Sequence, residues 1–227
     1  MNTVLFSFGN QKGGVGKSTL TALFASYVHY RTEYSVAVVD ADDMQSTLKK
    51  WRATDLKNGL NEEDTYDLFK IASKDFPSLY STKIHGNYNL VVLDMPGTLK
   101  QEGVVTSLIP VNLVISPLNL TQADIDATKA FLEEYKKVDD HRTSKGFDPA
   151  EKHLILSKLD RRTGAAKNLD AFKEASKWPI LNNVFAYRPS AFGTNVRTFM
   201  DDSWEKELDP MCAEIFDLVE KIYSDLN

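Results

Sequence analysis

The chain has 227 residues, a formal net charge of −5 and one cysteine, Cys212. A lone cysteine excludes a disulfide framework and any metal or iron–sulfur site that needs two cysteines from one chain. The negative charge argues against a constitutively basic nucleic-acid binder, and no apolar run approaches the roughly 18 residues needed to span a bilayer. We therefore expect a soluble, cytoplasmic protein with one compact domain over residues 1–227.

A glycine-rich turn separates a strand-like apolar run, residues 4–8, from a helix-like run, residues 20–28. Glycines carry no Cβ atom that would keep the backbone from closing around an anion. The helix that follows points free N–H groups and its positive dipole end at the same place, which predicts a triphosphate site. Lys17 would reach the β- and γ-phosphates, and the Ser18 hydroxyl would bind Mg²⁺. The predicted nucleotide contacts in this turn are Lys12, Gly13, Gly14, Val15, Gly16, Lys17, Ser18 and Thr19.

The common phosphate-loop pattern, G-x-x-x-x-G-K-[ST], is not strictly met, because Gln11 stands where its first glycine would be. The run KGGVGKST over residues 12–19 instead resembles the deviant Walker A motif of the ParA/MinD family of P-loop ATPases. In that family a second, signature lysine precedes the paired glycines and crosses a dimer interface to the partner's nucleotide. The resemblance gives this role to Lys12, and it is closest over roughly residues 1–130.

Residues 35–40 are predicted to be a buried parallel strand that ends on a carboxylate, Asp40, beside the phosphates. Asp40 and Asp42 can then serve the Mg²⁺ shell and the attacking water respectively. The family pattern here is D-x-D-P-Q, whereas this chain lacks the proline and has one extra residue before Gln45. In the alternative interpretation Asp42 and Asp43 only cap the helix that starts near residue 45, and this is the better interpretation for Asp43.

Residues 88–94 form a second clear strand that ends on an acid, and residues 95–97 follow as a turn. This stretch resembles the Walker B segment running into switch II. The resemblance implies that Asp94 holds Mg²⁺ through a water molecule. Gly97 has no side chain in the way, so its N–H group can face the γ-phosphate.

The rest of the chain alternates between strand-like and helix-like runs, which predicts an α/β fold with a doubly wound, mostly parallel sheet. Ser157 stands where relatives commonly have an asparagine that reaches toward the base. Arg188 and Pro189 stand where relatives carry an arginine or proline near the adenine, and they are the candidate base contacts. The further strands expected are residues 66–71, 113–117, 153–162 and 180–185, and the further helices are residues 46–52, 76–84, 121–135 and 209–226.

The resemblance implies slow, Mg²⁺-dependent ATP hydrolysis by a homodimer that holds the nucleotide between its subunits. Lys17 and the loop amides would hold the phosphates, Asp42 would orient the attacking water, and Lys12 would act across the interface as an arginine finger does elsewhere. Short ParA-like ATPases of plasmids or conjugative elements resemble this chain best, and they position DNA together with a centromere-binding or conjugation protein. The expected metal set is Ser18, Asp40 and Asp94.

Three other classes share this fold. A MinD-like membrane-positioning ATPase needs a basic amphipathic terminal helix, but residues 209–226 are acidic and anionic lipid would repel them, so no membrane partner is expected. An ATPase of the nitrogenase iron-protein type needs two cysteines per subunit and is excluded. A small-molecule ligase or kinase, such as a relative of dethiobiotin synthetase, stays open.

Residues 141–197 hold eleven Lys and Arg residues against five Asp and Glu residues. Dimerisation would double this basic surface, which predicts non-specific binding of duplex DNA by the ATP-bound dimer. The alternative is an ordinary solvated face. The candidate DNA contacts are Lys145, Lys152, Arg161, Arg162, Lys167, Lys173 and Lys177.

Overall fold

The computed structural model describes residues 2–42, 46–159, 169–186, 198–199 and 202–226. Their strands form a seven-stranded sheet in the order β3-β2-β4-β1-β5-β6-β7, and every strand pair is parallel. The predicted α/β fold with a doubly wound parallel sheet is confirmed. The strands are β1 (Val4–Phe8), β2 (Val36–Asp40), β3 (Asp67–Lys70), β4 (Leu90–Asp94), β5 (Leu113–Leu118), β6 (Glu151–Leu159) and β7 (Phe185–Ala186).

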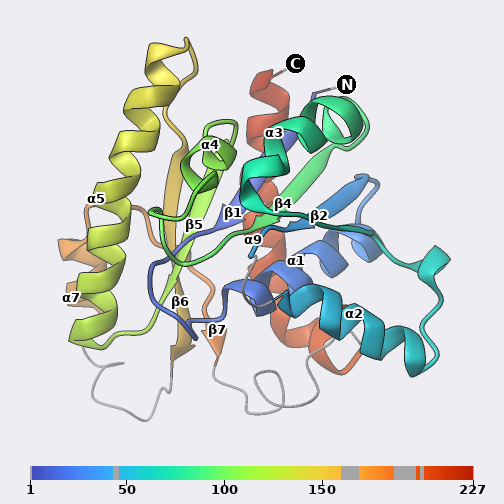
Figure 1. The fold of residues 1–227 in the computed structure, drawn as a ribbon. Coiled ribbons are helices and arrows are strands. Elements are labelled where there is room, and N and C mark those ends of the chain that lie inside the picture. The colour runs from blue at the N-terminus through green and yellow to red at the C-terminus, as the bar shows by residue number, and fades with distance from the viewer. Residues whose placement is uncertain (1, 43–45, 160–168, 187–197, 200–201, 227) are drawn as a thin grey trace.

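Helices cover both faces of the sheet (Figure 1). One face packs against α1, α2 and α9, and the other against α3, α4, α5 and α7. Along β1, Phe6 and Phe8 turn toward α1, where both contact Phe24 edge-on, whereas Leu5 turns to the opposite face. The helices are α1 (Lys17–Arg31), α2 (Thr47–Lys57), α3 (Phe76–Leu79), α4 (Val104–Leu108), α5 (Gln122–Ser144), α7 (Leu169–Ala175) and α9 (Asp202–Leu226).

The central strands β1, β2, β4 and β5 are buried at every residue. This burial explains their nearly continuous apolar sequences, because helices exclude water from both faces. The chain leaves β1 toward the β4–β2 side of the sheet and later returns to place β5 on the other side of β1. The order of the strands therefore reverses at β1, and a doubly wound sheet binds its ligand at the carboxyl end of such a strand.

Two sequence predictions about strands and short helices need correction. Residues 180–185 were expected to form one strand, but Ile180 makes only an isolated bridge to Leu154, and β7 begins at Phe185. The amides of Asn182 and Asn183 donate to the carboxylate of Glu214 instead of pairing with β6. The single helix expected at residues 76–84 is a short α-helical turn followed by a π-helical turn, Tyr80–Ile84.

Several helices are longer than the sequence predicts, or were not predicted. The helix α5 continues nine residues past Tyr135, because Arg142 near its end donates to the carbonyls of Val111 and Asp148. Similarly, α2 continues to Lys57, and α4 and α7 were not predicted. Among the described residues, no helix combines the length and apolarity that crossing a membrane requires.

Candidate functional site

The loop between β1 and α1 takes its shape from glycines. Gly14 and Gly16 have φ angles of +74° and +101°, in the left-handed region that other residues rarely adopt. Gly16 is also the N-cap of α1 and provides no side-chain cap, so the first N–H groups of the helix face the loop. A Cβ atom on Gly13 or Gly14 would meet nothing within 4 Å, so the space above the loop is open. This arrangement suits a phosphate group.

A pocket of about 450 Å³ lies over the loop, with walls from the segments that follow β2 and β4. Lys12 and Val15 line a separate, smaller pocket of about 190 Å³ on the side of α5. The structure therefore divides the predicted phosphate contacts between two sides of the loop. The larger pocket is lined by the predicted site residues Gly13, Gly14, Gly16, Lys17, Ser18, Thr19, Asp42 and Gly97.

Lys17 is the first residue of α1, and its side chain turns back over the loop. Its Nζ atom donates to the carbonyl of Lys12 at 3.2 Å. Burial lowers the pKa of Lys17, while the negative charges of Asp94 and Asp42 act in the opposite direction. The lysine is thus held at the pocket, close to Asp94 and Asp42, where its ammonium group could also bind a phosphate.

Ser18 lines the pocket, and its hydroxyl forms a hydrogen bond with Asp94, the last residue of β4. Burial raises the pKa of Asp94 to about 7, and the nearby Asp40 acts in the same direction, against a hydrogen bond from Ser18 and the charge of Lys17. Asp94 Oδ1 is buried and accepts no hydrogen bond within the described part of the chain. A serine hydroxyl beside a buried carboxylate, one oxygen of which accepts no hydrogen bond from the described residues, fits Mg²⁺, which prefers oxygen ligands.

Asp40 pairs with Asp94 across the β2–β4 register, and its side chain is fully buried. Its Oδ1 atom lies 3.5 Å from Nζ of Lys70, the last residue of β3. Within the described segments, no three Asp, Glu, His or Cys side chains are grouped closely enough to hold a metal ion by themselves. A Mg²⁺ ion here would therefore depend on the Ser18 hydroxyl and on nucleotide phosphates as well as on carboxylates.

Asp42 lies in the pocket wall, where Thr47 and Trp51 of α2 also contribute. The N-cap of α2 is Ser46, at a φ of +45°, so the alternative that Asp42 caps this helix is not supported. The corresponding alternative for Asp43 lies outside the described residues. Lys70 Nζ donates to the carbonyl of Asp42 at 2.7 Å, which ties the segment after β2 to the edge strand.

Gly97, in the predicted switch II turn, lies directly against the P-loop. A Cβ atom at this position would be 2.9 Å from the carbonyl oxygen of Gln11 and 3.4 Å from that of Asn10. Because both neighbours are backbone atoms, they cannot easily give way, and the close approach requires glycine. The contact brings the turn after β4 to the predicted phosphate site.

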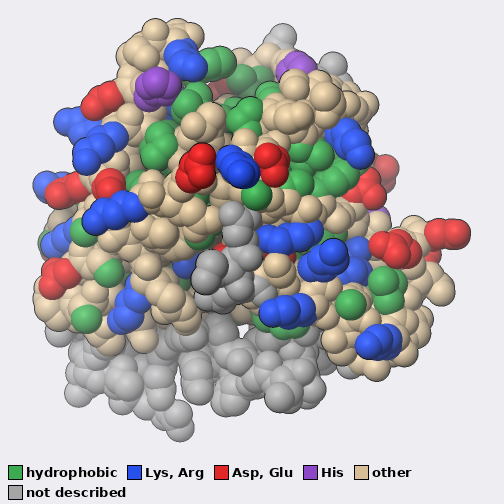
Figure 2. Space-filling model, in the orientation of Figure 1, with side chains coloured by type: hydrophobic (Ala, Val, Ile, Leu, Met, Phe, Trp, Pro, Cys, Tyr) green, Lys and Arg blue, Asp and Glu red, His purple; other side chains and the backbone are tan. Residues whose placement is uncertain are grey.

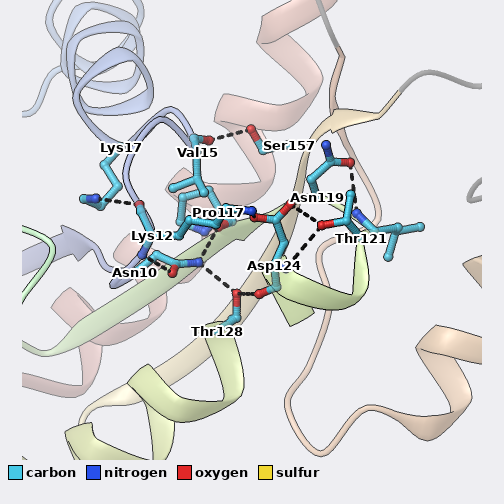
Figure 3. Close-up of polar contacts among 11 residues, drawn as sticks. Asn10, Lys12, Val15, Lys17, Pro117, Asn119, Thr121, Asp124, Thr128 and Ser157 are labelled. Carbon is cyan, nitrogen blue, oxygen red and sulfur yellow. Dashed lines mark hydrogen bonds and ion pairs between the residues drawn. The ribbon is translucent and has the colours of Figure 1, made fainter. Parts of the chain in front are cut away.

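Lys12 points to the other side of the loop (Figure 3). Its Nζ atom forms an ion pair with Asp124 Oδ1 at 2.5 Å, and the side chains are 39% and 6% exposed respectively. Asp124 lies in the first turn of α5, where the Thr121 hydroxyl donates to its other carboxylate oxygen at 2.6 Å. Asn10 accepts from the Lys12 amide at 2.9 Å and donates to the Thr128 hydroxyl at 2.8 Å. The Lys12 side of the loop is therefore fixed to α5.

The predicted base-contact region is only partly described. Ser157 is buried, and its hydroxyl donates to the carbonyl of Val15 at 2.8 Å, so it supports the loop. Arg188 and Pro189 lie outside the described residues, as do Arg161, Arg162 and Lys167 of the proposed DNA surface.

Residues 6–192 match the model of the CobQ/CobB/MinD/ParA nucleotide-binding domain. The chain belongs to this family. No curated protein sequence matches it significantly. The family match covers the loop, both strands that end on carboxylates and the helix that carries Asp124.

Solved structures with the same fold include both ParA-like and MinD members of the family. A protein described as a plasmid partition protein of Borrelia burgdorferi B31, bound to AMPPNP, superposes with a TM-score of 0.68 and 18% identity over 96% of this chain and 99% of its own. MinD of Aquifex aeolicus gives 0.64 and 16% over 99% and 97%. Cobyrinic acid a,c-diamide synthase of Mycobacterium smegmatis, with ADP and magnesium, gives 0.60 and 19% over 84% and 89%.

Two charged residues of this ParA/MinD-family chain were missed by sequence reasoning. Lys70 ends β3 at the register position of Asp40, and the pairing of β2 with β3 could have suggested it. Asp124 stands three residues after Thr121, a spacing typical of a helix N-terminus. That spacing predicts a capping role and gives no sign of the contact with Lys12.

Proposed function

We propose that this chain is a Mg²⁺-dependent ATPase that dimerises around ATP and positions or segregates the DNA of a plasmid or conjugative element. The observation that carries the proposal is the orientation of two lysines from one loop. Lys17 faces the pocket among acidic side chains, whereas Lys12 is held outside it by Asp124. A P-loop enzyme that works as a single subunit needs only the lysine that faces the pocket, Lys17. A second lysine on the outer side of the loop suits a site that a second subunit completes.

In this proposal the loop amides and Lys17 bind the phosphates of ATP. Ser18 and Asp94 hold Mg²⁺, which when bound supplies positive charge to the phosphate oxygens. Asp42, in the pocket wall, orients the water that attacks the γ-phosphate and accepts its proton. Asp40 is buried beneath them and acts on this site through its charge.

Hydrolysis would be coupled to dimerisation through Lys12. The lysine exchanges Asp124 of its own subunit for the phosphates bound by the partner. The exchange leaves the Asp124 carboxylate with the hydrogen bond from Thr121. A cation that arrives only in the dimer stabilises the transition state and so links assembly to turnover.

The structure of the described residues reduces the number of candidate DNA contacts. Lys152 forms an ion pair with Asp139 and is only 14% exposed, so it does not belong to a free basic surface. Lys145 and Lys177 are exposed, and Lys173 lies on α7. Over α5, the view in Figure 2 shows basic and acidic side chains mixed together. DNA binding by this chain would thus depend on bringing two subunits together.

Turnover with and without duplex DNA tests the proposal. We expect slow ATP hydrolysis that rises with protein concentration and with added DNA or partner protein. Filter binding with a non-hydrolysable ATP analogue should retain DNA of any sequence at low salt and lose it steeply toward physiological salt. Absence of DNA retention at low salt would exclude direct DNA binding and leave a protein partner.

The same assay separates the alternatives. A small-molecule ligase or kinase would turn over ATP only with its second substrate, regardless of DNA. A MinD-like protein would bind anionic vesicles with ATP, and the exposed acids Asp217, Glu220 and Asp225 on α9 oppose such binding.

A further inference from the structure

The segment that carries Asp42 is held from one side by the edge strand β3 and the turn that follows it. Three successive carbonyl groups accept hydrogen bonds from that side, two of them from side chains. These bonds run from Ile71 N to the Asp40 carbonyl at 3.2 Å, from Ser73 Oγ to the Ala41 carbonyl at 2.9 Å, and from Lys70 Nζ to the Asp42 carbonyl at 2.7 Å. Side chains that bind main-chain carbonyls fix the path of a segment beyond the end of its strand pairing. The placement of Asp42 therefore depends on β3.

The turn after β3, Ser73–Asp75, is itself anchored to α4. The hydroxyl of Ser107 donates to the carbonyl of Ser73 at 2.6 Å. Gly103, the N-cap of α4, has a φ of +82°, and a Cβ atom there would lie 2.4 Å from Lys74 Cα. Backbone packs directly on backbone at this point, so α4 supports the turn from behind.

Lys70 is the charged member of this support. Besides the Asp42 carbonyl, its Nζ atom approaches Asp40 Oδ1 at 3.5 Å, and its side chain is 19% exposed. Asp40 has no contact with water, so a neighbouring ammonium compensates a carboxylate that would otherwise be costly to bury. On the P-loop side, Lys17 interacts with the neighbouring carboxylates of Asp94 and Asp42. Lys17 therefore serves the carboxylates at the pocket, whereas Lys70, which does not line the pocket, serves Asp40 and the main chain at Asp42.

We propose that Lys70 is a positioning residue for ATP hydrolysis, acting through Asp42. Its ammonium holds the Asp42 carbonyl, and the fixed main chain directs the Asp42 side chain at the water that attacks the γ-phosphate. This inference rests on the proposed function, in which Asp42 orients that water. Lys70 does not line the pocket, so its loss should lower kcat and leave ATP binding in place.

The primary test compares Lys70→Met with Lys70→Arg and with a matched control, Lys83→Met, whose lysine is exposed on the π-helical turn before β4. We expect Lys70→Met to lower the single-turnover rate by about tenfold or more while the Kd for ATP stays within about threefold. Lys70→Arg should recover part of the rate, because the guanidinium can still donate to the carbonyl. Lys83→Met should match the parent. An unchanged rate in Lys70→Met overturns the inference.

Action through Asp42 has a specific signature in double variants. If Lys70 works by placing Asp42, Lys70→Met should slow hydrolysis little further once Asp42→Ala is present. Full additivity of the two effects would contradict the inference. Asp40→Asn in the Lys70→Met background examines charge compensation separately. Recovery of the parent rate there would mean that Lys70 only neutralises Asp40, and would also overturn the inference.

Two further measurements address a folding defect in Lys70→Met and separate this inference from the proposed function. Should Lys70→Met fold poorly, Ser73→Ala removes the neighbouring bond without removing a charge, and we expect it also to lower kcat with ATP affinity kept. If Lys70→Met folds poorly, a parent rate in Ser73→Ala would overturn the inference. A parent chain that binds ATP without hydrolysing it overturns the proposed function. Parent turnover combined with unchanged Lys70 variants overturns this inference alone.

Discussion

The two sides of the P-loop hold their lysines in different ways. On the β2–β4 side, Lys17 is partly buried near the carboxylates of Asp94 and Asp42, faces the pocket, and has a lowered pKa. On the β5–α5 side, Lys12 keeps 39% of its side chain exposed and forms an ion pair with Asp124. One loop thus presents a lysine that faces the proposed phosphate site and a second lysine that the proposal releases from Asp124 in the dimer.

Typical interaction energies agree with this difference between Lys12 and Lys17. Ion pairs with an exposed partner contribute roughly 0–1 kcal/mol to stability, whereas a charged hydrogen bond to a buried group contributes about 1.5–3 kcal/mol. Exchange of Asp124 for a partner's triphosphate would therefore be inexpensive for Lys12. Lys17 has no comparable exchange, because its removal leaves Asp94 and Asp42 facing the phosphates without a cation.

The largest effect is expected from Lys17→Ala. The substitution removes a cation from a site that must hold several phosphate charges, and Asp94 and Asp42 would then repel the nucleotide. We predict that the Kd for ATP rises by about 1,000-fold, measured by isothermal titration calorimetry. Lys83→Ala, at an exposed lysine far along the chain, should bind like the parent. Retained affinity in Lys17→Ala would contradict the P-loop assignment.

Lys12→Ala sharpens the comparison, because it should keep the ATP affinity that Lys17→Ala loses. We predict that ATP affinity stays within about fivefold of the parent while the hydrolysis rate falls by about 100-fold, since a cation supplied across an interface acts on the transition state. Light scattering with a non-hydrolysable ATP analogue should show loss of the dimer. A variant that dimerises and turns over like the parent would make Lys12 an ordinary loop lysine.

The Lys17 side of the loop was largely predictable from sequence, and the Lys12 side was not. Apolar runs that end on Asp40 and Asp94, and a glycine turn before a helix, are local patterns. Parallel pairing brings their carboxyl ends together, and the register of Asp40 with Asp94 confirms it. The contact of Lys12 with Asp124 joins positions 112 residues apart, and no local pattern encodes it.

The secondary-structure predictions that were wrong also failed because of contacts between residues far apart in the sequence. The helix α5 was predicted to end at Tyr135. In the structure Asp139 and Arg142 are buried, since the Ala150 amide and the Val111 carbonyl satisfy them from other parts of the chain. Likewise, residues 180–185 read as a strand, but the amides of Asn182 and Asn183 bind Glu214 of α9. Polar groups satisfied by distant partners are invisible to periodicity.

Asp94→Asn tests how much the buried charge of Asp94, on the Lys17 side of the loop, destabilises the fold as the pH rises. A carboxyl whose pKa rises on folding to about 7 binds its proton more tightly in the folded chain, so its ionisation destabilises the fold. The destabilisation is absent near pH 4 and complete above pH 7. We predict that Asp94→Asn raises the free energy of unfolding by up to about 4 kcal/mol at pH 8 and by much less at pH 4.

The measurement is urea denaturation in EDTA, so that bound metal does not offset the charge. Asp140→Asn, at an exposed position of α5, serves as the control and should show no such dependence on pH. If Asp94→Asn is equal to or less stable than the parent at pH 8, then Lys17 and Ser18 compensate the carboxylate fully, and the pocket is not strained in the absence of metal.

The smallest effect is expected from Asp124→Asn, which addresses the Lys12 side alone. The amide can still accept the hydrogen bond from Thr121, so the start of α5 is preserved while Lys12 loses its ionic partner. Because the pair is partly exposed, we predict that the protein concentration needed for half-maximal dimerisation with ATP analogue falls by two- to fivefold, about 0.4–1 kcal/mol. Asp126→Asn, on the exposed face of the same helix, should change nothing. Weaker dimerisation in Asp124→Asn would mean that Asp124 aims Lys12 at the partner instead of holding it back, and the two sides of the loop would then both be fixed in advance.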